Sequence, residues 1–355
     1  MADVGDALAN VAVWDCRVGS WLGGEFLGIV PVNGGTVTWS KDRDVPGSIT
    51  LEVPAEVDGV SWVPGDDPAH PLARFGQELT VDVTVSDPAT NAEQGFQLGR
   101  FVNQDWNSDT GGVGVNASSM FSRVEDDRFT SPAATKTNGT LASEAARLTP
   151  DLCDVKIDDA LTDRAVPSMS WDESRIDSLK ELAEAWPARL REFRDGTLQF
   201  LAPIETITTP ELRFTDGEGG TAIEVASSDS RDAIYNIVVA RGQETGEDGS
   251  PTFQGIAAQN SGPLAVSGPY GRVPRFFSSP LITSKSAALK SAQTMLKNSI
   301  SSSKILRVTA APDPRVWLDV PVAVIRDGVE QWGLISGFTL PLLGDADMTV
   351  DVEVF

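Results

Sequence analysis

The chain has 355 residues, with 28 Lys and Arg against 51 Asp and Glu, and a formal net charge of −23 at neutral pH. Its length is typical of about two domains, and its 41% hydrophobic content is that of a globular protein. The acidic excess excludes a protein that grips nucleic acid through a basic surface, because such binding needs Lys and Arg to displace counterions from phosphates.

Several kinds of site are also excluded. Cys16 and Cys153 are far apart and form no CxxC, which argues against a zinc ribbon or a disulfide scaffold. The single histidine, His70, cannot supply the several imidazoles of many metal sites. The sequence shows no secretory signal and no apolar run long enough to span a bilayer. We therefore expect a soluble protein made inside the cell, without membrane insertion.

Alternating apolar and polar residues dominate the first third of the chain. Leu79, Val81, Val83 and Val85 alternate with polar residues, which places the apolar set on one face of a half-buried strand. Further strands are predicted at Val11–Val18, Thr36–Ser40, Ser48–Val53, Phe96–Val102 and Val113–Phe121. Short strands separated by Gly and Pro turn signals predict an antiparallel barrel or sandwich.

The middle of the chain predicts an α+β unit. One helix is expected over Thr140–Leu148, and a second begins at Ser170, where Ser170–Glu173 fits a capping box, and ends near Trp186. Two strands follow, Ala188–Phe193 and Thr197–Leu201, around an Asp-Gly turn that suits a tight hairpin.

The last third returns to strands around one helix. The helix spans Lys285–Ile300, with Thr283 or Ser284 as its cap. Strands are predicted at Thr221–Ala226, Ala233–Arg241, Ile305–Ala310, Leu318–Ile325, Gln331–Leu340 and Met348–Phe355. The polar stretch Gln243–Ser250 is expected to be an exposed loop.

Two blocks of the sequence resemble one another. Val81–Val85 is followed by Gln94, Leu98 and Phe101, and Val320–Val324 is followed by Gln331, Ile335 and Phe338 with the same internal spacing. Chance resemblance between hairpins is one explanation; a duplication that gives two related β-barrels is the other.

The fold class predicted is mainly β with α+β inserts: two related antiparallel β-barrel domains plus two smaller helix-containing domains. The expected division is an N-terminal barrel at 1–128, an α+β insert at 129–205, a second barrel at 206–242 and 305–355, and a loop-and-helix insert at 243–304.

No catalytic constellation stands out. His70 lies between prolines and no GxSxG is present, so an exposed loop histidine is expected. Cys16 follows an apolar strand pattern and is expected to be a buried core thiol, as is Cys153. We predict no catalytic residue, no cofactor site and no metal site.

Acidic and aromatic residues offer two further alternatives. A glycosidase needs two carboxylates that converge on a sugar, and the adjacent acids here are typical of solvated turns. These acids are Asp66/Asp67, Glu125/Asp126/Asp127 and Asp158/Asp159. Trp62 and Trp106 could stack on sugars, although such residues more often belong to strands or the core.

An ordered series of short motifs resembles the minor tail proteins of phages that infect actinobacteria. The motifs are Val166–Trp171, Ser174–Leu179, Leu182-Ala183, Asp195–Leu198, Ser230-Arg231, Tyr235–Val239, Arg241-Gly242, Gly268–Pro274, Ser279–Leu281 and Ala287-Ala288. This family is similar to the baseplate-hub or tail-tip hub proteins of tailed phages.

The resemblance implies a structural, non-enzymatic virion protein of a siphophage tail tip, assembled in the host cytoplasm. It implies a homotrimer whose six barrels match the six-fold tail tube, in contact with the tape-measure protein, the distal tail protein and other tail-tip proteins, with DNA passing through unbound. Alternatives are a tail-associated cell-wall hydrolase, a carbohydrate-binding host-recognition protein and the distal tail ring itself. Self-association should rest on apolar and strand-edge contacts, and because like charges oppose it, it should weaken as ionic strength falls.

Overall fold

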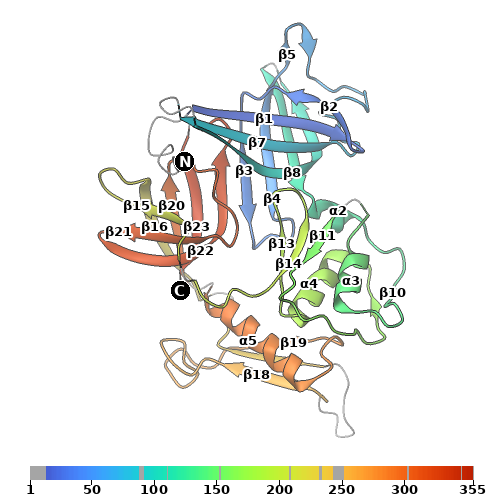
Figure 1. The fold of residues 1–355 in the computed structure, drawn as a ribbon, viewed down its shortest axis with the longest axis vertical. Helices are drawn as coiled ribbons and strands as arrows, with labels where there is room; N and C mark the ends of the chain where they lie inside the picture. Colours follow the sequence, from blue (N-terminus) through green and yellow to red (C-terminus); the bar gives the residue numbers. More distant parts are fainter. Residues whose placement is uncertain are drawn as a thin grey trace.

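The computed structural model describes residues 13–87, 92–109, 111–151, 153–207, 209–231, 234–242, 252–301, 304–344 and 346–354. Within these residues, thirteen strands form one large, mainly antiparallel sheet, accompanied by smaller sheets and helices α2 to α5. Figure 1 shows the large sheet in the upper part of the view, with the helices below and beside it.

The N-terminal half of the large sheet contains the strands predicted from alternation. Val81 and Val83 are buried and Asp82 between them is exposed, as the pattern predicts. Its strands are β1 (Val13–Leu22), β2 (Glu25–Val30), β3 (Gly34–Ser40), β4 (Gly47–Pro54), β7 (Glu78–Asp87), β8 (Ala92–Ser108) and β9 (Gly112–Ser119). Between β4 and β7 the chain forms a long loop, Ala55–Gln77, that carries the short hairpin β5 (Glu56–Val57) and β6 (Val60–Ser61).

The C-terminal half repeats the spatial order of the N-terminal half. Its strands are β15 (Leu212–Thr215), β16 (Ala222–Asp229), β20 (Lys304–Ala310), β21 (Pro321–Arg326), β22 (Val329–Pro341) and β23 (Met348–Val354). The order β16-β20-β23-β22-β21-β15 parallels β3-β4-β9-β8-β7-β1. One difference is that β15 pairs with β21 in parallel, whereas β1 pairs with β7 antiparallel.

The similar sequence blocks occupy equivalent positions in the two halves. Val85 lies opposite Gln94 across β7 and β8, and Val324 lies opposite Gln331 across β21 and β22. Leu98 and Phe101 are buried, as are Ile335 and Phe338 at the matching positions, and all belong to one hydrophobic cluster that spans both halves.

The expected pair of closed barrels is not found among the described strands, because the strands of both halves belong to one continuous thirteen-stranded sheet. The reason lies in the length of β22. Its first half pairs with the shorter β21, and its second half, Gly337–Pro341, extends past β21 and pairs with Thr36–Ser40 of β3. The backbone hydrogen bonds of this part of β22 and of β3, which could have closed each half into a barrel, instead join the two halves.

A first insert, residues 121–201, packs around its own hydrophobic cluster. It contains α2 (Phe121–Asp126), β10 (Ala133–Ala134), α3 (Leu141–Leu148), β11 (Val155–Ile157), β12 (Ser170–Trp171), α4 (Arg175–Ala185), β13 (Arg189–Glu192) and β14 (Leu198–Leu201). Thr140 caps α3, where its hydroxyl accepts a hydrogen bond from the Ser143 N–H, and the hairpin of β13 and β14 has the expected turn.

Two predictions for this region are wrong. The helix expected from Ser170 begins at Arg175, because Ser174 is the residue that caps it. Ser170-Trp171 instead forms a strand, and the buried Trp171 pairs with Ala133. The strand expected to reach Phe121 ends at Ser119, since Phe121 opens the short helix α2.

A second insert comprises β17 (Ile237–Arg241), β18 (Gln254–Ala258), β19 (Pro274–Ser278) and α5 (Lys285–Ser301). Of the described residues in the strand predicted over Ala233–Arg241, only Ile237–Arg241 form a strand, β17, and it pairs with β18 and β19 rather than with the large sheet. Helix α5 lies directly on β18 at Gly255, where a Cβ atom would come within 2.3 Å of the Leu289 nitrogen. The loop expected at Gln243–Ser250 lies outside the described residues.

In the part of the chain that the structure describes, no helix has the length and apolar character needed to cross a membrane.

Candidate functional site

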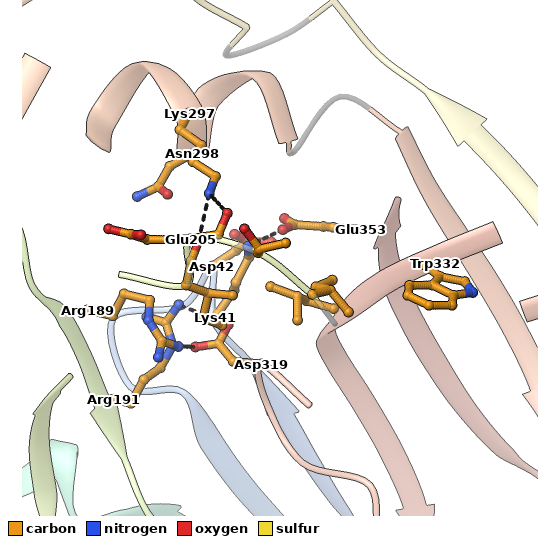
Figure 2. Close-up of a pocket in the computed structure, with 14 residues that line it drawn as sticks. Lys41, Asp42, Arg189, Arg191, Glu205, Lys297, Asn298, Asp319, Trp332 and Glu353 are labelled. Atoms are coloured by element: carbon orange, nitrogen blue, oxygen red, sulfur yellow. Dashed lines mark hydrogen bonds and ion pairs between the residues drawn. The ribbon is translucent and has the colours of Figure 1, made fainter. Parts of the chain in front are cut away.

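A cavity of about 530 Å³ lies where all parts of the chain meet. Its walls come from the loop after β3, from β13, from the linker Ile204–Ile207 after β14, from α5, and from β22 and β23. Charged side chains from these elements converge on it in Figure 2. Because the cavity touches both halves of the sheet and both inserts, we take it as the candidate functional site.

Asp319 fastens the first insert to the C-terminal half. Arg189 and Arg191 of β13 both pair with its carboxylate, and the Arg191 Nε lies 2.7 Å from Oδ2. Burial opposes ionisation of Asp319, but the charges of Arg191 and Arg189 outweigh it and hold the pKa of this carboxyl below its usual value. The carboxylate is therefore an ionised hydrogen-bond acceptor at neutral pH.

Contacts of two lysines also join parts of the chain, and together with the ion pairs of Asp319 we call them the joint. Lys41, just after β3, pairs with Glu353 of β23, whose side chain is buried. Lys297 of α5 donates to the carbonyl oxygens of Ile204 and Glu205, at 2.8 and 2.6 Å. The linker that leaves the first insert is thus held by the second insert (Figure 2).

The tip of the β13–β14 hairpin reaches a cluster of aromatic rings between the two halves. The Arg194 guanidinium lies 4.6 Å from the centre of the Trp317 ring and donates to carbonyl oxygens of Gln97, Pro314, Arg315 and Val316. Trp317 also contacts Trp39 of β3 and Phe338 of β22, which lie opposite one another across the seam between the halves.

In the described part of the chain, this arrangement holds distant elements together. A catalytic site would place a nucleophile or a proton donor where a substrate could reach it. Here the charged groups of Lys41, Arg189, Arg191, Asp319 and Glu353 are engaged with one another across elements distant in sequence.

The candidates from the sequence lie elsewhere and serve the fold. His70 lies in the loop between β4 and β7, where its Nδ1 accepts the Leu72 N–H at 3.1 Å and its ring meets Trp62 edge-on. Burial lowers its pKa, against the opposing effects of a hydrogen bond to the Ser61 backbone and the charge of Asp67. His70 is thus in a loop, as expected, but it is half-buried rather than exposed, because it packs against Trp62 and accepts the Leu72 N–H.

Both cysteines are poor nucleophiles: Cys153 is buried as expected, whereas Cys16 is half-buried against the main cluster rather than inside it. Burial raises the pKa of the Cys16 thiol to about 12, with further effects from Asp15 and Asp82. Burial also raises the pKa of Cys153 to about 12, and its thiol faces the Met120 carbonyl. A thiol with so high a pKa holds almost no thiolate at neutral pH.

The acidic pairs and the two tryptophans do not meet in the cavity. Asp66/Asp67 lie in the loop between β4 and β7, Glu125–Asp127 at the end of α2, and Asp158/Asp159 after β11. Neither these acids nor Trp62 and Trp106 line it, and both indole rings pack against the main core.

Sequence reasoning missed the residues that form the joint. Arg189, Arg191 and Arg194 lie close together in an acidic chain, and this local basic run was the available signal. Their main partners, Asp319 and the carbonyl groups near Trp317, lie more than 100 residues away along the chain. Only the tertiary structure brings them together.

Glu192 provides a pH test of the neighbouring hairpin. Its carboxyl oxygens accept the N–H groups of Met120 and Phe121 at the start of α2. Burial raises its pKa from 4.5 to about 8, against these bonds and one from Ser119. Between those two pH values the folded chain keeps a proton that the unfolded chain releases, so this group makes the free energy of unfolding fall as pH rises.

Glu192→Gln removes this titration. Relative to the wild type, the variant should therefore gain stability as pH rises from about 5 to about 8. Urea unfolding at several pH values measures this difference, with the exposed Glu125→Gln as the control. A difference that stays constant or shrinks over that range would contradict the assignment.

No family model matches the sequence, and no curated protein matches it. Solved structures do match. The 43 kDa tail protein of prophage MuSo2 from Shewanella oneidensis aligns with 96% of this chain and 98% of its own, with a TM-score of 0.63 at 15% identity. The tail protein from Neisseria meningitidis MC58 aligns with 96% of this chain and 96% of its own, with a TM-score of 0.67 at 12% identity.

A third structure is the prophage tail protein gp18 from Listeria monocytogenes EGD-e, with a TM-score of 0.56 at 12% identity over 95% of this chain and 94% of its own. The chain has the fold of these phage tail proteins. Because each match covers nearly all of both chains, the tail-protein fold includes the two halves of the sheet and both inserts.

Proposed function

We propose that this chain is a structural protein of a phage tail tip, the hub of a siphophage-type baseplate. The observation that carries the proposal is the fold shared over nearly the whole chain with prophage tail proteins. The joint supports it, since its ion pairs fasten parts of the chain together and leave no evident catalytic group. A non-enzymatic role follows from this reading.

The repeated strand order suggests how the hub would assemble. Each chain carries two sheet halves of the same order, joined edge to edge by β22 and β3. Three copies in a closed ring would present six similar elements, so a three-fold ring could meet a six-fold tube. We propose a homotrimer on this ground, in contact with the distal tail protein, the tape-measure protein and other tail-tip proteins, with DNA passing through.

The hydrophobic clusters support a division of the chain into parts. One cluster spans the two sheet halves, a second fills the first insert and a third lies between α5 and its sheet. We propose that the two halves behave as one body, with the inserts as separate smaller units.

Electron microscopy of purified virions labelled with an antibody against this chain tests the proposal. Label at the tail tip, together with three-fold averages of the isolated protein, is the expected result. Six-fold averages would instead indicate the distal tail ring. Clearing of host cell wall in a zymogram, or glycan binding lost on Trp62→Ala or Trp106→Ala, would overturn the structural assignment.

A further inference from the structure

Charge is strongly segregated along this chain. Residues 252–301 contain no Asp or Glu and five cationic residues, so this stretch carries +5 in a chain of −23, and the remainder carries −28. The five are Arg272, Arg275, Lys285, Lys290 and Lys297. The stretch includes β18, β19 and α5. The whole second insert, residues 237–301, also contains Arg241 and the acids Glu244, Glu247 and Asp248, so its net charge is +3, while the rest of the chain is strongly acidic.

The second insert also carries an open groove. The groove has a volume of about 470 Å³ and lies between β18 and the face of α5 that includes Gln293, Leu296 and Ile300. Among the described strands, β18 pairs only with β17, so its outer edge is unpaired. Ile256, beside the groove, is 55% exposed.

Helix α5, which forms one wall of this groove, carries exposed cations outside the residues that line it. Lys285 and Lys290 are exposed on α5, and no ion pair to either is found in the described ranges. Lys290 lies three residues before Gln293 and seven before Lys297, both of which line the groove. This spacing places Lys290 on the same face of the helix. The surface therefore suits an acidic segment that brings apolar side chains.

The opposite end of the molecule has that chemistry. Figure 1 shows the loop that carries β5 at one end of the longest axis, and β18 with α5 at the other end. Val60 and Phe75 of this loop are 61% and 59% exposed. Its acids Glu56 and Asp66 are exposed, and neither has an ion-pair partner among the described residues.

We propose that the Ala55–Gln77 loop of one copy docks on the groove of the second insert of another copy. Such a contact joins two different surfaces, so it is heterologous and leads to a closed ring or to a stack. Its apolar contact is Val60 of the β5–β6 hairpin against Ile256, with loop carboxylates facing Lys285 and Lys290, while Phe75 lies under the Arg74 guanidinium and stays outside the contact. This contact goes beyond the proposed hub function and does not depend on it.

The proposal reverses the salt dependence expected from an evenly spread charge. Opposite charges at the two ends attract, so self-association through this contact should strengthen as ionic strength falls. Sedimentation velocity of the full chain at about 50 mM and about 500 mM NaCl measures the sign, since the Debye length falls severalfold between them.

Charge reversal identifies the surfaces. Lys285→Glu/Lys290→Glu alters the groove and Glu56→Lys/Asp66→Lys alters the loop; each should weaken association about tenfold or more, because like charges then face one another. A chain with all four substitutions should regain it, since the complementarity is restored with opposite signs. Arg17→Glu/Lys136→Glu makes the same net change as the groove variant at exposed sites elsewhere and should leave association unchanged.

Melting temperatures confirm that each variant is folded. Association that grows with salt, a groove or loop variant that assembles like the wild type, or no recovery in the fourfold variant would overturn the proposal. A groove that serves only another acidic protein would give these same negative results. Three-fold rings with unchanged salt response would remove this contact and leave the hub function standing.

Discussion

Val322→Asp should unfold the C-terminal half of the large sheet. Val322 is fully buried in β21, and it lies opposite Gly333 of β22 with its side chain in the main cluster. An aspartate there would be a buried charge without a partner, at a cost of about 4 kcal/mol or more of the free energy of unfolding. Urea unfolding followed by tryptophan fluorescence measures the loss.

The chain offers two matched comparisons for this variant. Val83 occupies the equivalent position in the N-terminal half, opposite Phe96, and is also fully buried, so Val83→Asp should be as damaging. Val329→Asp makes the same change at a site that is 57% exposed on the neighbouring strand, and it should cost little. A Val322→Asp variant as stable as Val329→Asp would show that the inward register of β21 is wrong.

Strands with one buried face could be predicted from the sequence, and strands without one could not. The alternation of β7 matches its burial, because it packs one face on the shared cluster. The alternation of β23 matches from Met348 to Val352, but Glu353 is buried and Val354 is only half-buried, the reverse of the pattern. β18 was missed: its residues, Gln254–Ala258, are mostly small and show no clear alternation. Their conformation depends on α5, which packs on Gly255 and lies about 30 residues further along the chain.

The two similar sequence blocks form equivalent hairpins in the two halves, whereas the closed barrels that a duplication suggested are not found among the described strands. Equivalent blocks placed Val324 opposite Gln331 as Val85 lies opposite Gln94, since register within a hairpin is a local property. Whether a half closes on itself depends on which distant edge takes up the free hydrogen bonds of β22. That edge is β3, roughly 300 residues earlier, and no local pattern specifies it.

The ion pairs of the joint could not be predicted from the sequence for a related reason. Arg189 and Arg191 alternate on a short strand, which from sequence alone is equally typical of a solvated face. Asp319 becomes their partner only when the C-terminal half lies beside the first insert. These contacts join distant parts of the chain, and a motif search directed at catalytic residues cannot find such contacts.

Arg194→Met should separate the first insert from the sheet. Arg194 donates to carbonyl oxygens of both halves of the sheet: that of Gln97 in the N-terminal half, and those of Pro314, Arg315 and Val316 in the C-terminal half. Burial lowers its pKa to about 10, so it stays charged at neutral pH. Methionine keeps much of the packing on Trp317 but no donor, so buried carbonyls lose their partner at a cost of about 3 kcal/mol.

Arg194→Lys is the informative companion, because it keeps the charge but loses the planar fork that reaches several carbonyls at once. It should recover only part of the lost stability. Arg213→Met, at an exposed arginine paired with Glu330, provides the control and should change little. Limited proteolysis should cut Arg194→Met faster than wild type in the linker Ile204–Ile207, since that segment depends on the insert staying docked. If Arg194→Met unfolds and is cleaved like Arg213→Met, the hairpin tip does not hold the two halves and the insert together.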